Sequence, residues 1–257
     1  MKRQIKSAIR HLLPSPVYIW LHRTYGKTRA GFRGQTYVPP PGRVDFGDLR
    51  RVKPISELEG YERGLPVDRY YIEKFLASNS GHIKGHVLEI GDDEYTKKFG
   101  KDRVEKSDIL NYDKGFNPRT TIEADLSSAP HIPADTFDCI IFTQTLQFIY
   151  DMHSAIRTLN RILKPGGVLL ATLGGISNTY GVGPSESDWY WLFTASSASR
   201  IFQEDFPAAG MEVTPHGNVL AAIGFLEGLS FHEFSENELD YYDPRYQMLI
   251  TVKATKK

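Results

Sequence analysis

The feature that most constrains the fold is a strand–helix–strand pattern in the middle of the chain. The run FDCIIFTQTL, residues 137–146, begins with a segment that is apolar on both faces. An amphipathic helix follows over residues 151–163, with Asp151 as its predicted N-cap, and KPGG ends it before the apolar run VLLATL, residues 168–173. A doubly apolar strand followed by a helical crossover is typical of a parallel sheet that is covered by helices on both faces.

The same alternation continues on both sides of this segment. Further strands are predicted at 86–90, 103–110, 120–126, 211–216 and 246–254, and further helices near 196–206 and 219–229. We therefore predict an α/β fold with a mainly parallel sheet, in which the last two strands pair as an antiparallel edge. Only 12 residues, 91–102, separate the first two strands, so at least one crossover helix must be abbreviated.

The N-terminal region differs from the rest of the chain in charge. Residues 1–44 contain nine Lys or Arg and no Asp or Glu, so all 31 acidic residues lie further along. We predict a basic N-terminal arm (1–44), a linker with a helical cap (45–84) and an α/β domain (85–257). In the cap, a helix within 65–78 is predicted to have Asp68 as its N-cap.

A basic arm ahead of an acidic domain can contact an acidic partner or an anionic membrane surface, where Val17–Leu21 would lie against lipid. A solvated or self-docking tail is the alternative. Nucleic-acid binding would rest on the arm alone and is not expected.

The cysteine content bears on the compartment. Cys139 is the only cysteine, which excludes an intrachain disulfide and fits a reducing compartment, and its apolar surroundings predict a buried structural thiol. Because no apolar stretch approaches the roughly 20 residues of a spanning helix, we expect a cytoplasmic protein, with peripheral membrane contact through the arm left open.

Residues 85–173 resemble the class I S-adenosylmethionine-dependent methyltransferases. The segment 132–173 (IPADTFDCIIFTQTLQFIYDMHSAIRTLNRILKPGGVLLATL) is similar to the family's fourth strand, the loop after it, the helix and the fifth strand. GLPVDRYYIEKFL, residues 64–76, and WYWLFTASSASRIFQEDFP, residues 189–207, are similar to bacterial methyltransferase-like proteins associated with sugar-modifying enzymes. The resemblance implies a Rossmann-like three-layer α/β/α sandwich, with a mainly parallel seven-stranded sheet and an antiparallel edge strand.

The resemblance also implies S-adenosyl-L-methionine as cofactor and methyl transfer to a small-molecule or glycan-like acceptor, with oxygen as the favoured acceptor atom. It assigns Glu89 to the acidic position near the end of the first strand and Gly91 to the first glycine of the turn. Asp108 would receive the ribose hydroxyls, and Asp125 with Leu126 would lie on the adenine side. Each acidic residue also has a purely structural alternative. Glu89 could be a strand-end acid with satisfied hydrogen bonds, Asp108 could be a surface charge, and Asp125 could cap a turn. The predicted cofactor-binding residues are Glu89, Gly91, Asp92, Asp108, Asp125, Leu126 and Gln144.

The predicted substrate-facing residues follow the fourth and fifth strands. Gln147 lies in the stretch that faces the methyl group in the family, and aromatic residues after the fifth strand suit stacking on a sugar or aromatic ring. These aromatic residues could equally serve only to anchor their loop. His216 is a weak candidate for a general base, and no metal site is predicted. The predicted substrate residues are Gln147, Tyr180, Trp189 and Trp191.

The turn after the first strand departs from the family. Where the family continues with small residues, this chain has Asp92 and Asp93. A carboxylate there would attract the ammonium or sulfonium of the cofactor and repel its carboxylate. The alternative hypothesis is therefore a non-catalytic, methyltransferase-like binding or assembly protein with an altered cofactor turn.

Overall fold

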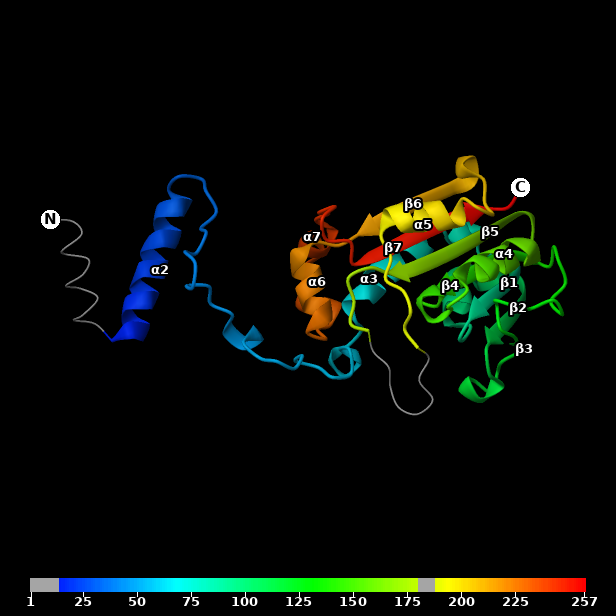
Figure 1. Ribbon diagram of the computed structural model, residues 1–257, viewed down its shortest axis with the longest axis horizontal. Coiled ribbons are helices and arrows are strands. Elements are labelled where there is room, and N and C mark those ends of the chain that lie inside the picture. Colours follow the sequence, from blue (N-terminus) through cyan, green and yellow to red (C-terminus); the bar gives the residue numbers. More distant parts are fainter. Residues whose placement is uncertain (1–13, 180–187) are drawn as a thin grey trace. The chain divides into compact units, whose positions relative to one another are not determined.

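The computed structural model describes residues 14–179 and 188–257, and the chain divides into two compact units (Figure 1). The first unit, Met1–Val52, contains the helix α2 (Ser15–Gly31), and the second unit, Lys53–Lys257, contains the sheet. The cap helix α3 (Val67–Ser78), predicted to lie outside the α/β domain, is part of the second unit.

The second unit is built on a seven-stranded sheet of order β3-β2-β1-β4-β5-β7-β6. The strands β3, β2, β1, β4 and β5 are parallel to one another, whereas β7 runs antiparallel to both β5 and β6. The predicted fold class is thereby confirmed, including the antiparallel edge. The strands are β1 (Gly85–Ile90), β2 (Val104–Asn111), β3 (Ile122–Glu123), β4 (Phe137–Thr143), β5 (Leu163–Gly174), β6 (Met211–His216) and β7 (Leu249–Thr255).

Helices cover both faces of this sheet, because strand residues alternate between two apolar clusters. In β4, Ile140 and Phe142 pack on one face with α4 and α5, whereas Cys139 and Ile141 pack on the other with α3, α6 and α7 (Figure 1). Cys139 is fully buried, which confirms the structural thiol, and burial raises its pKa. The remaining helices are α4 (Met152–Ile162), α5 (Ala195–Phe202), α6 (Val219–Leu226) and α7 (Glu236–Asp240).

The crossovers at the β3 end of the sheet are abbreviated, as the sequence predicts. Between β1 and β2 the chain forms a π-helical turn, Thr96–Gly100, and a 3-10 turn, Lys101–Arg103. A single 3-10 turn, Lys114–Phe116, lies between β2 and β3. Neither crossover carries a full α-helix, so the β3 end of the sheet has less helical cover than the rest.

The two predicted N-caps have different outcomes. Asp151 caps α4, accepting a hydrogen bond from the amide of Ser154, which confirms the prediction. The prediction for Asp68 is wrong, because α3 begins at Val67 with Pro66 before it. Pro66 already sets the backbone geometry at the start of the helix, and Asp68 lies buried in the first turn beside Arg69.

A search of the described residues for membrane spans found no helix with the length and apolar character needed.

Candidate cofactor and substrate site

The carboxyl ends of β1, β2, β4 and β5 lie at one edge of the sheet, because these strands are parallel. Ligands of open α/β sheets bind beyond this edge. The residues that follow these strands, namely Gly91, Tyr112, Gln144 and Gly175, therefore define the candidate site.

The turn after β1 depends on Gly91. Its φ of +94° falls in the region that glycine tolerates, and a Cβ at this position would meet no atom within 4 Å. Its carbonyl oxygen accepts hydrogen bonds from the side-chain amides of Asn111 (3.1 Å) and Asn117 (3.0 Å). Side chains at and after the end of β2 thus hold the turn in place, and open space remains beside its glycine.

Glu89 stabilises this turn from within. Its buried carboxylate accepts hydrogen bonds from the backbone amides of Tyr95 (3.2 Å) and Thr96 (2.7 Å). Burial outweighs these hydrogen bonds and raises the pKa of Glu89 to about 8. Glu89 therefore organises the residues after the turn, and its predicted contact with the cofactor stays a prediction.

The two aspartates of the turn are engaged by neighbouring groups. Asp92 accepts a hydrogen bond from the backbone amide of Glu94 (2.9 Å). The buried Asp93 forms ion pairs with Lys97 (2.7 Å) and Arg119. Burial acts to raise the pKa of Asp93, but Lys97 and Arg119 outweigh it and hold the pKa below its usual range. The negative charge that the sequence places at this turn is therefore largely balanced.

The prediction that Asp108 lies at the end of the second strand is wrong. β2 continues to Asn111, and Asp108 lies within the strand, opposite Leu88 of β1. Its carboxylate contacts His86 Nε2 (2.6 Å) and Lys106 Nζ (3.0 Å), which lower its pKa against the opposing effect of burial. The acidic residue just beyond the strand is instead Asp113, which is exposed and accepts a hydrogen bond from the amide of Gly115 (2.7 Å).

Asp125 and Leu126 follow the short strand β3. Asp125 is exposed, and its Oδ1 accepts hydrogen bonds from the amide (2.8 Å) and hydroxyl (2.7 Å) of Ser127. Leu126 is buried in the apolar core. Asp125 thus caps a turn and still presents a carboxylate at the edge, whereas the wall predicted for Leu126 stays a prediction.

Two glutamines after β4 have unpaired polar atoms. Gln144 adopts a φ of +48°, a conformation that non-glycine residues seldom take and that concentrates at functional sites. Gln147 Nε2 donates a hydrogen bond to Gln144 Oε1 (3.1 Å), while Gln144 Nε2 and Gln147 Oε1 are buried without a hydrogen-bond partner. A buried donor and a buried acceptor in one pair are suited to a polar ligand.

The predicted aromatic residues lie beside this pair. Trp189 packs edge-on against Phe148, with 5.0 Å between the ring centroids. Gly174 lies next to both Gln144 and Trp189, because a Cβ added to it would be 3.5 Å from Gln144 Oε1 and 3.6 Å from the Trp189 ring. The indole N–H of Trp189 donates to the carbonyl of Trp191 (2.9 Å).

Trp191 is held similarly. Its indole N–H donates to the carbonyl of Ile149 (3.1 Å), and its ring packs near Tyr150. The structure brings Gln144, Gln147 and Trp189 together and gives Trp191 an anchoring position. Tyr180 lies outside the described residues.

Comparisons with known proteins identify this domain. The family described as "Methyltransferase domain" matches residues 77–171. UbiE of Pasteurella multocida, named a ubiquinone/menaquinone biosynthesis C-methyltransferase, is 30% identical over 118 residues, which cover 38% of this chain and 43% of that protein. The mitochondrial arginine-hydroxylase NDUFAF5 of Danio rerio is 25% identical over 105 residues, 41% of this chain and 32% of that protein. The chain therefore spans less than half the length of these curated relatives.

Solved structures show the same fold. A methyltransferase from Archaeoglobus fulgidus has a TM-score of 0.51 at 10% identity and covers 77% of this chain and 98% of its own. One from Mesorhizobium loti has a TM-score of 0.50 at 17% identity and covers 74% of this chain and 100% of its own. Residues 77–171 therefore match a methyltransferase domain, and S-adenosylmethionine-dependent methyltransferases of known structure share the fold of the second unit. The cofactor of this family is S-adenosylmethionine.

The residues at the edge of the methyltransferase sheet fit this cofactor. Gly91 leaves space beside the turn, and Asp113 and Asp125 present exposed carboxylates suited to hydroxyl and amino groups. The unpaired amide atoms of Gln144 and Gln147 supply a donor and an acceptor for the polar groups of the methionine portion or of an acceptor. The balanced charge of Asp93 removes much of the repulsion expected for the cofactor's carboxylate.

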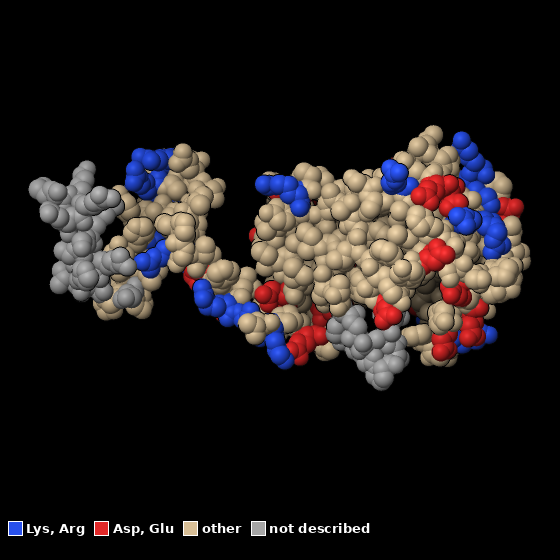
Figure 2. Space-filling view, in the orientation of Figure 1, with Lys and Arg blue, Asp and Glu red and all other residues tan. Residues whose placement is uncertain are grey.

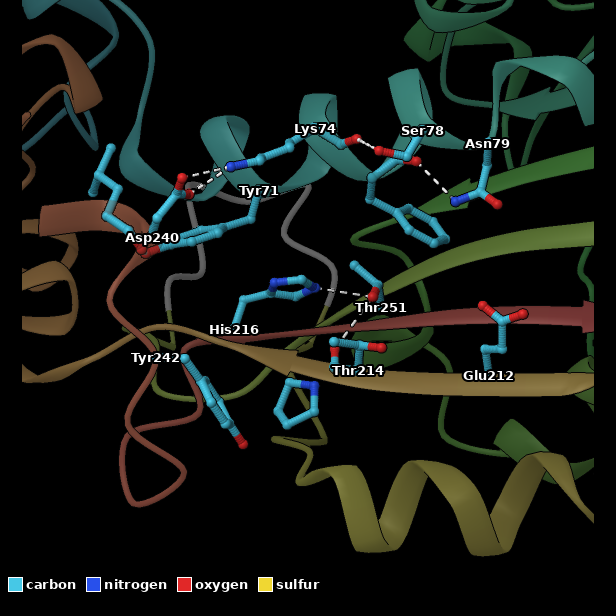
Figure 3. Close-up of a pocket in the computed structure, with 13 residues that line it drawn as sticks. Tyr71, Lys74, Ser78, Asn79, Glu212, Thr214, His216, Asp240, Tyr242 and Thr251 are labelled. Atoms are coloured by element: carbon cyan, nitrogen blue, oxygen red, sulfur yellow. Dashed lines mark hydrogen bonds and ion pairs between the residues drawn. The ribbon is translucent and has the colours of Figure 1, made fainter. Parts of the chain in front are cut away.

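His216 belongs to a different part of the methyltransferase. It ends β6, which β5 and β7 separate from β4, and it lines a groove of about 480 Å³ between α3 and the β6–β7 edge (Figure 3). Thr251 Oγ1 donates to the carbonyl of Thr214, so it accepts the hydrogen bond from His216 Nε2 (3.0 Å). Burial, and then the charge of Lys74, lower the pKa of His216 to about 4. The structure does not bring His216 together with Gln144 or Gly91.

Four residues around the β1 turn of the candidate site were not predicted from the sequence, namely Asn111, Asp113, Asn117 and Arg119. Their signal is the polar stretch NYDKGFNPR, residues 111–119, because Asn and Asp side chains commonly bond the backbone of turns. The contacts to Gly91 and Asp93 join the segment after β1 to residues at and after the end of β2. These residues are far apart in the sequence, so no local pattern predicts the contacts.

Proposed function

We propose that the chain transfers a methyl group from S-adenosylmethionine to a small-molecule or glycan-like acceptor, at an oxygen atom. The observation that carries the proposal is the pair Gln144 and Gln147, in which a buried donor and a buried acceptor atom have no partner; the pair lies near Trp189 at the carboxyl edge of the sheet. Leaving both atoms without a partner costs stability, and a polar ligand would offset this cost.

Four residues would hold the cofactor. Gly91 gives the turn its close approach, and Asp113 would accept hydrogen bonds from the ribose hydroxyls. Asp125 would accept from the adenine amino group, and Gln144 Nε2 would donate to the carboxylate of the methionine portion. When bound, S-adenosylmethionine supplies the electrophilic methyl group.

The chain's own contribution is to align the acceptor and exclude water. Gln147 Oε1 would accept a hydrogen bond from the acceptor hydroxyl and so orient the oxygen lone pair that attacks. The exposed rings of Tyr150 and Tyr190, 5.2 Å apart, together with Trp189, offer apolar faces on which a sugar can stack. These rings are the support for a glycan-like acceptor.

Calorimetric titration of the full chain with S-adenosylmethionine and S-adenosylhomocysteine tests the cofactor part. We expect binding of both compounds and a loss of roughly tenfold or more in affinity in Asp113→Asn, because a charge-assisted pair of hydrogen bonds is removed. Asp108→Asn is the matched control, and its affinity should stay within about twofold because Asp108 lies within β2. A larger loss in Asp108→Asn than in Asp113→Asn would contradict the assignment of the ribose contact.

The acceptor part is tested by S-adenosylhomocysteine release with a panel of hydroxylated sugars. Gln147→Leu should slow release far more than it weakens cofactor binding, because it removes the hydrogen bond to the acceptor. Equal loss in both measurements would place Gln147 in the cofactor contacts.

A non-catalytic binding or assembly protein is the second candidate, and the abbreviated crossovers beside the β1 turn favour it. This candidate predicts no binding of either cofactor form at millimolar concentration. That result would overturn the proposed methyl transfer.

A further inference from the structure

The N-terminal unit exposes an apolar stripe along one side of α2. Val17, Trp20, Leu21, Thr24, Tyr25 and Thr28 recur at the three- and four-residue spacing of one helix face. Trp20 is 64% exposed and Tyr25 is 67% exposed, which is unusual for large apolar rings on an ordered helix. The hydroxyls of Thr24 and Thr28 donate to the backbone carbonyls one turn earlier, so they add no unsatisfied polar group to the stripe.

The opposite side of α2 packs within its own unit. Gly26 lies so close to Tyr37 that a Cβ would come within 2.4 Å of the ring. Ile19 and His22 line a small cavity with Pro40 of the following segment. Among residues 14–52 of this unit, these contacts lie on one side of the helix, and the large apolar side chains of the stripe on the other side are exposed.

Cations border the stripe. At 100° per residue, Lys27 lies beside Trp20 on one margin and Arg29 lies beside Tyr25 on the other. Residues 1–44 carry nine Lys or Arg and no acidic residue, and Asp45 pairs with Arg23. Figure 2 shows this combination of blue cations and uncharged surface on the N-terminal unit.

We propose that α2 docks in the plane of an anionic membrane surface. Val17, Trp20, Leu21 and Tyr25 would enter the boundary between headgroups and acyl chains, while Lys27 and Arg29 contact lipid phosphates. Trp and Tyr favour this boundary because each combines an apolar ring with a polar group. At 17 residues, α2 suits an orientation along the surface.

The arrangement distinguishes lipid from other anionic partners. A nucleic acid is bound mainly through cations on the contacting face, whereas the contacting face of α2 is apolar and its cations lie on the margins. This inference does not depend on the proposed methyl transfer, and its test measures no turnover.

Co-sedimentation of the full chain with vesicles tests the docking. We expect binding to vesicles of phosphatidylcholine with phosphatidylglycerol and much weaker binding to phosphatidylcholine alone. Trp20→Glu should lower binding by about tenfold or more, because it places a charge in the apolar stripe. Val38→Glu is the matched control: Val38 is 80% exposed in the same unit, and the substitution makes the same change in charge away from α2. Leu21→Glu gives a second test within the stripe.

The cations are tested with a second matched pair. Lys27→Gln with Arg29→Gln should lower binding to anionic vesicles by roughly fivefold for each charge removed. Lys84→Gln with Arg200→Gln makes the same change in net charge at exposed positions of the second unit and should have little effect. Added salt should weaken binding of the unaltered chain.

Three results would overturn the proposal. The first is no binding of the unaltered chain to anionic vesicles, and the second is equal loss in Trp20→Glu and Val38→Glu. The third is light scattering that shows a dimer abolished by Trp20→Glu, with no vesicle binding, because the stripe would then pair with a second copy.

Discussion

The two ends of the sheet are built differently, although their strands belong to one fold. At the end formed by β4, β5, β7 and β6, full helices cover both faces, and large apolar side chains such as Phe142 and Phe202 are completely buried. At the β3 end, short turns replace the crossover helices, and the turn after β1 is fixed by polar contacts to Asn111, Asn117 and Arg119.

This difference shows how a shortened fold can retain its site. Apolar packing fixes the glutamine pair after β4, whereas ion pairs and amide hydrogen bonds fix the glycine turn after β1. Polar contacts of exposed partners contribute less stability than buried apolar side chains. The comparison therefore predicts unequal responses to substitution, pH and salt.

The largest effect is expected in the apolar core. Phe142→Ala should lower the free energy of unfolding by about 3–5 kcal/mol, because it leaves a cavity between β4 and the helices. Ile122→Ala in β3 should cost about 1 kcal/mol, since Ile122 is only partly buried. Urea unfolding of both variants measures the two costs, and equal values would remove the contrast between the two ends.

An intermediate effect is expected from acid at the β6 edge. His216 has a folded pKa of about 4, below its unfolded value of 6.5, so its contribution is present above pH 6.5 and is lost as the pH falls toward 4. The loss between pH 7 and pH 4 should be about 3 kcal/mol. In His216→Gln, which keeps a donor for Thr251, the free energy of unfolding should fall less between pH 7 and pH 4.5. If the free energy of unfolding fell equally with pH in the unaltered protein and in His216→Gln, His216 would not be a buried neutral histidine.

The smallest effect is expected at the glycine turn. Asp93→Asn removes ion pairs with Lys97 and Arg119, whose side chains are largely exposed, and should cost about 1 kcal/mol. The stabilisation by Asp93 is present above pH 3.8 and is lost as the pH falls below it, because the folded pKa is lowered. Asp102→Asn, at an exposed position of the same crossover, is the control. A cost that does not shrink in high salt would argue against the ion pairs.

The sequence predicts the fold better than the site. The alternation of strands and helices fixes the parallel sheet, and the strand Met211–His216 is predicted at its observed bounds. The predicted strand 103–110 agrees with β2 (Val104–Asn111) to within one residue at each end, but Asp108 lies three residues before the last residue of β2 and not at its end. The partner of Asp108 is His86 on a neighbouring strand, which no spacing within β2 reveals. Gln144 and Gln147 could be placed after β4 from the sequence, but their unpaired atoms require the packed structure.

The short strand β3 has a consequence for hydrogen exchange. It comprises two residues and pairs with β2 alone among the strands of the sheet, so its amides can open without unfolding of the helical end. A ligand bound across the ends of β1 and β2 would add its binding free energy to the cost of that opening. Amide exchange at residues 109–126 should therefore slow in proportion to ligand saturation, while exchange in β4 and β5 stays governed by global unfolding. Slower amide exchange at the β3 end of the sheet would thus report that the site is occupied by a ligand.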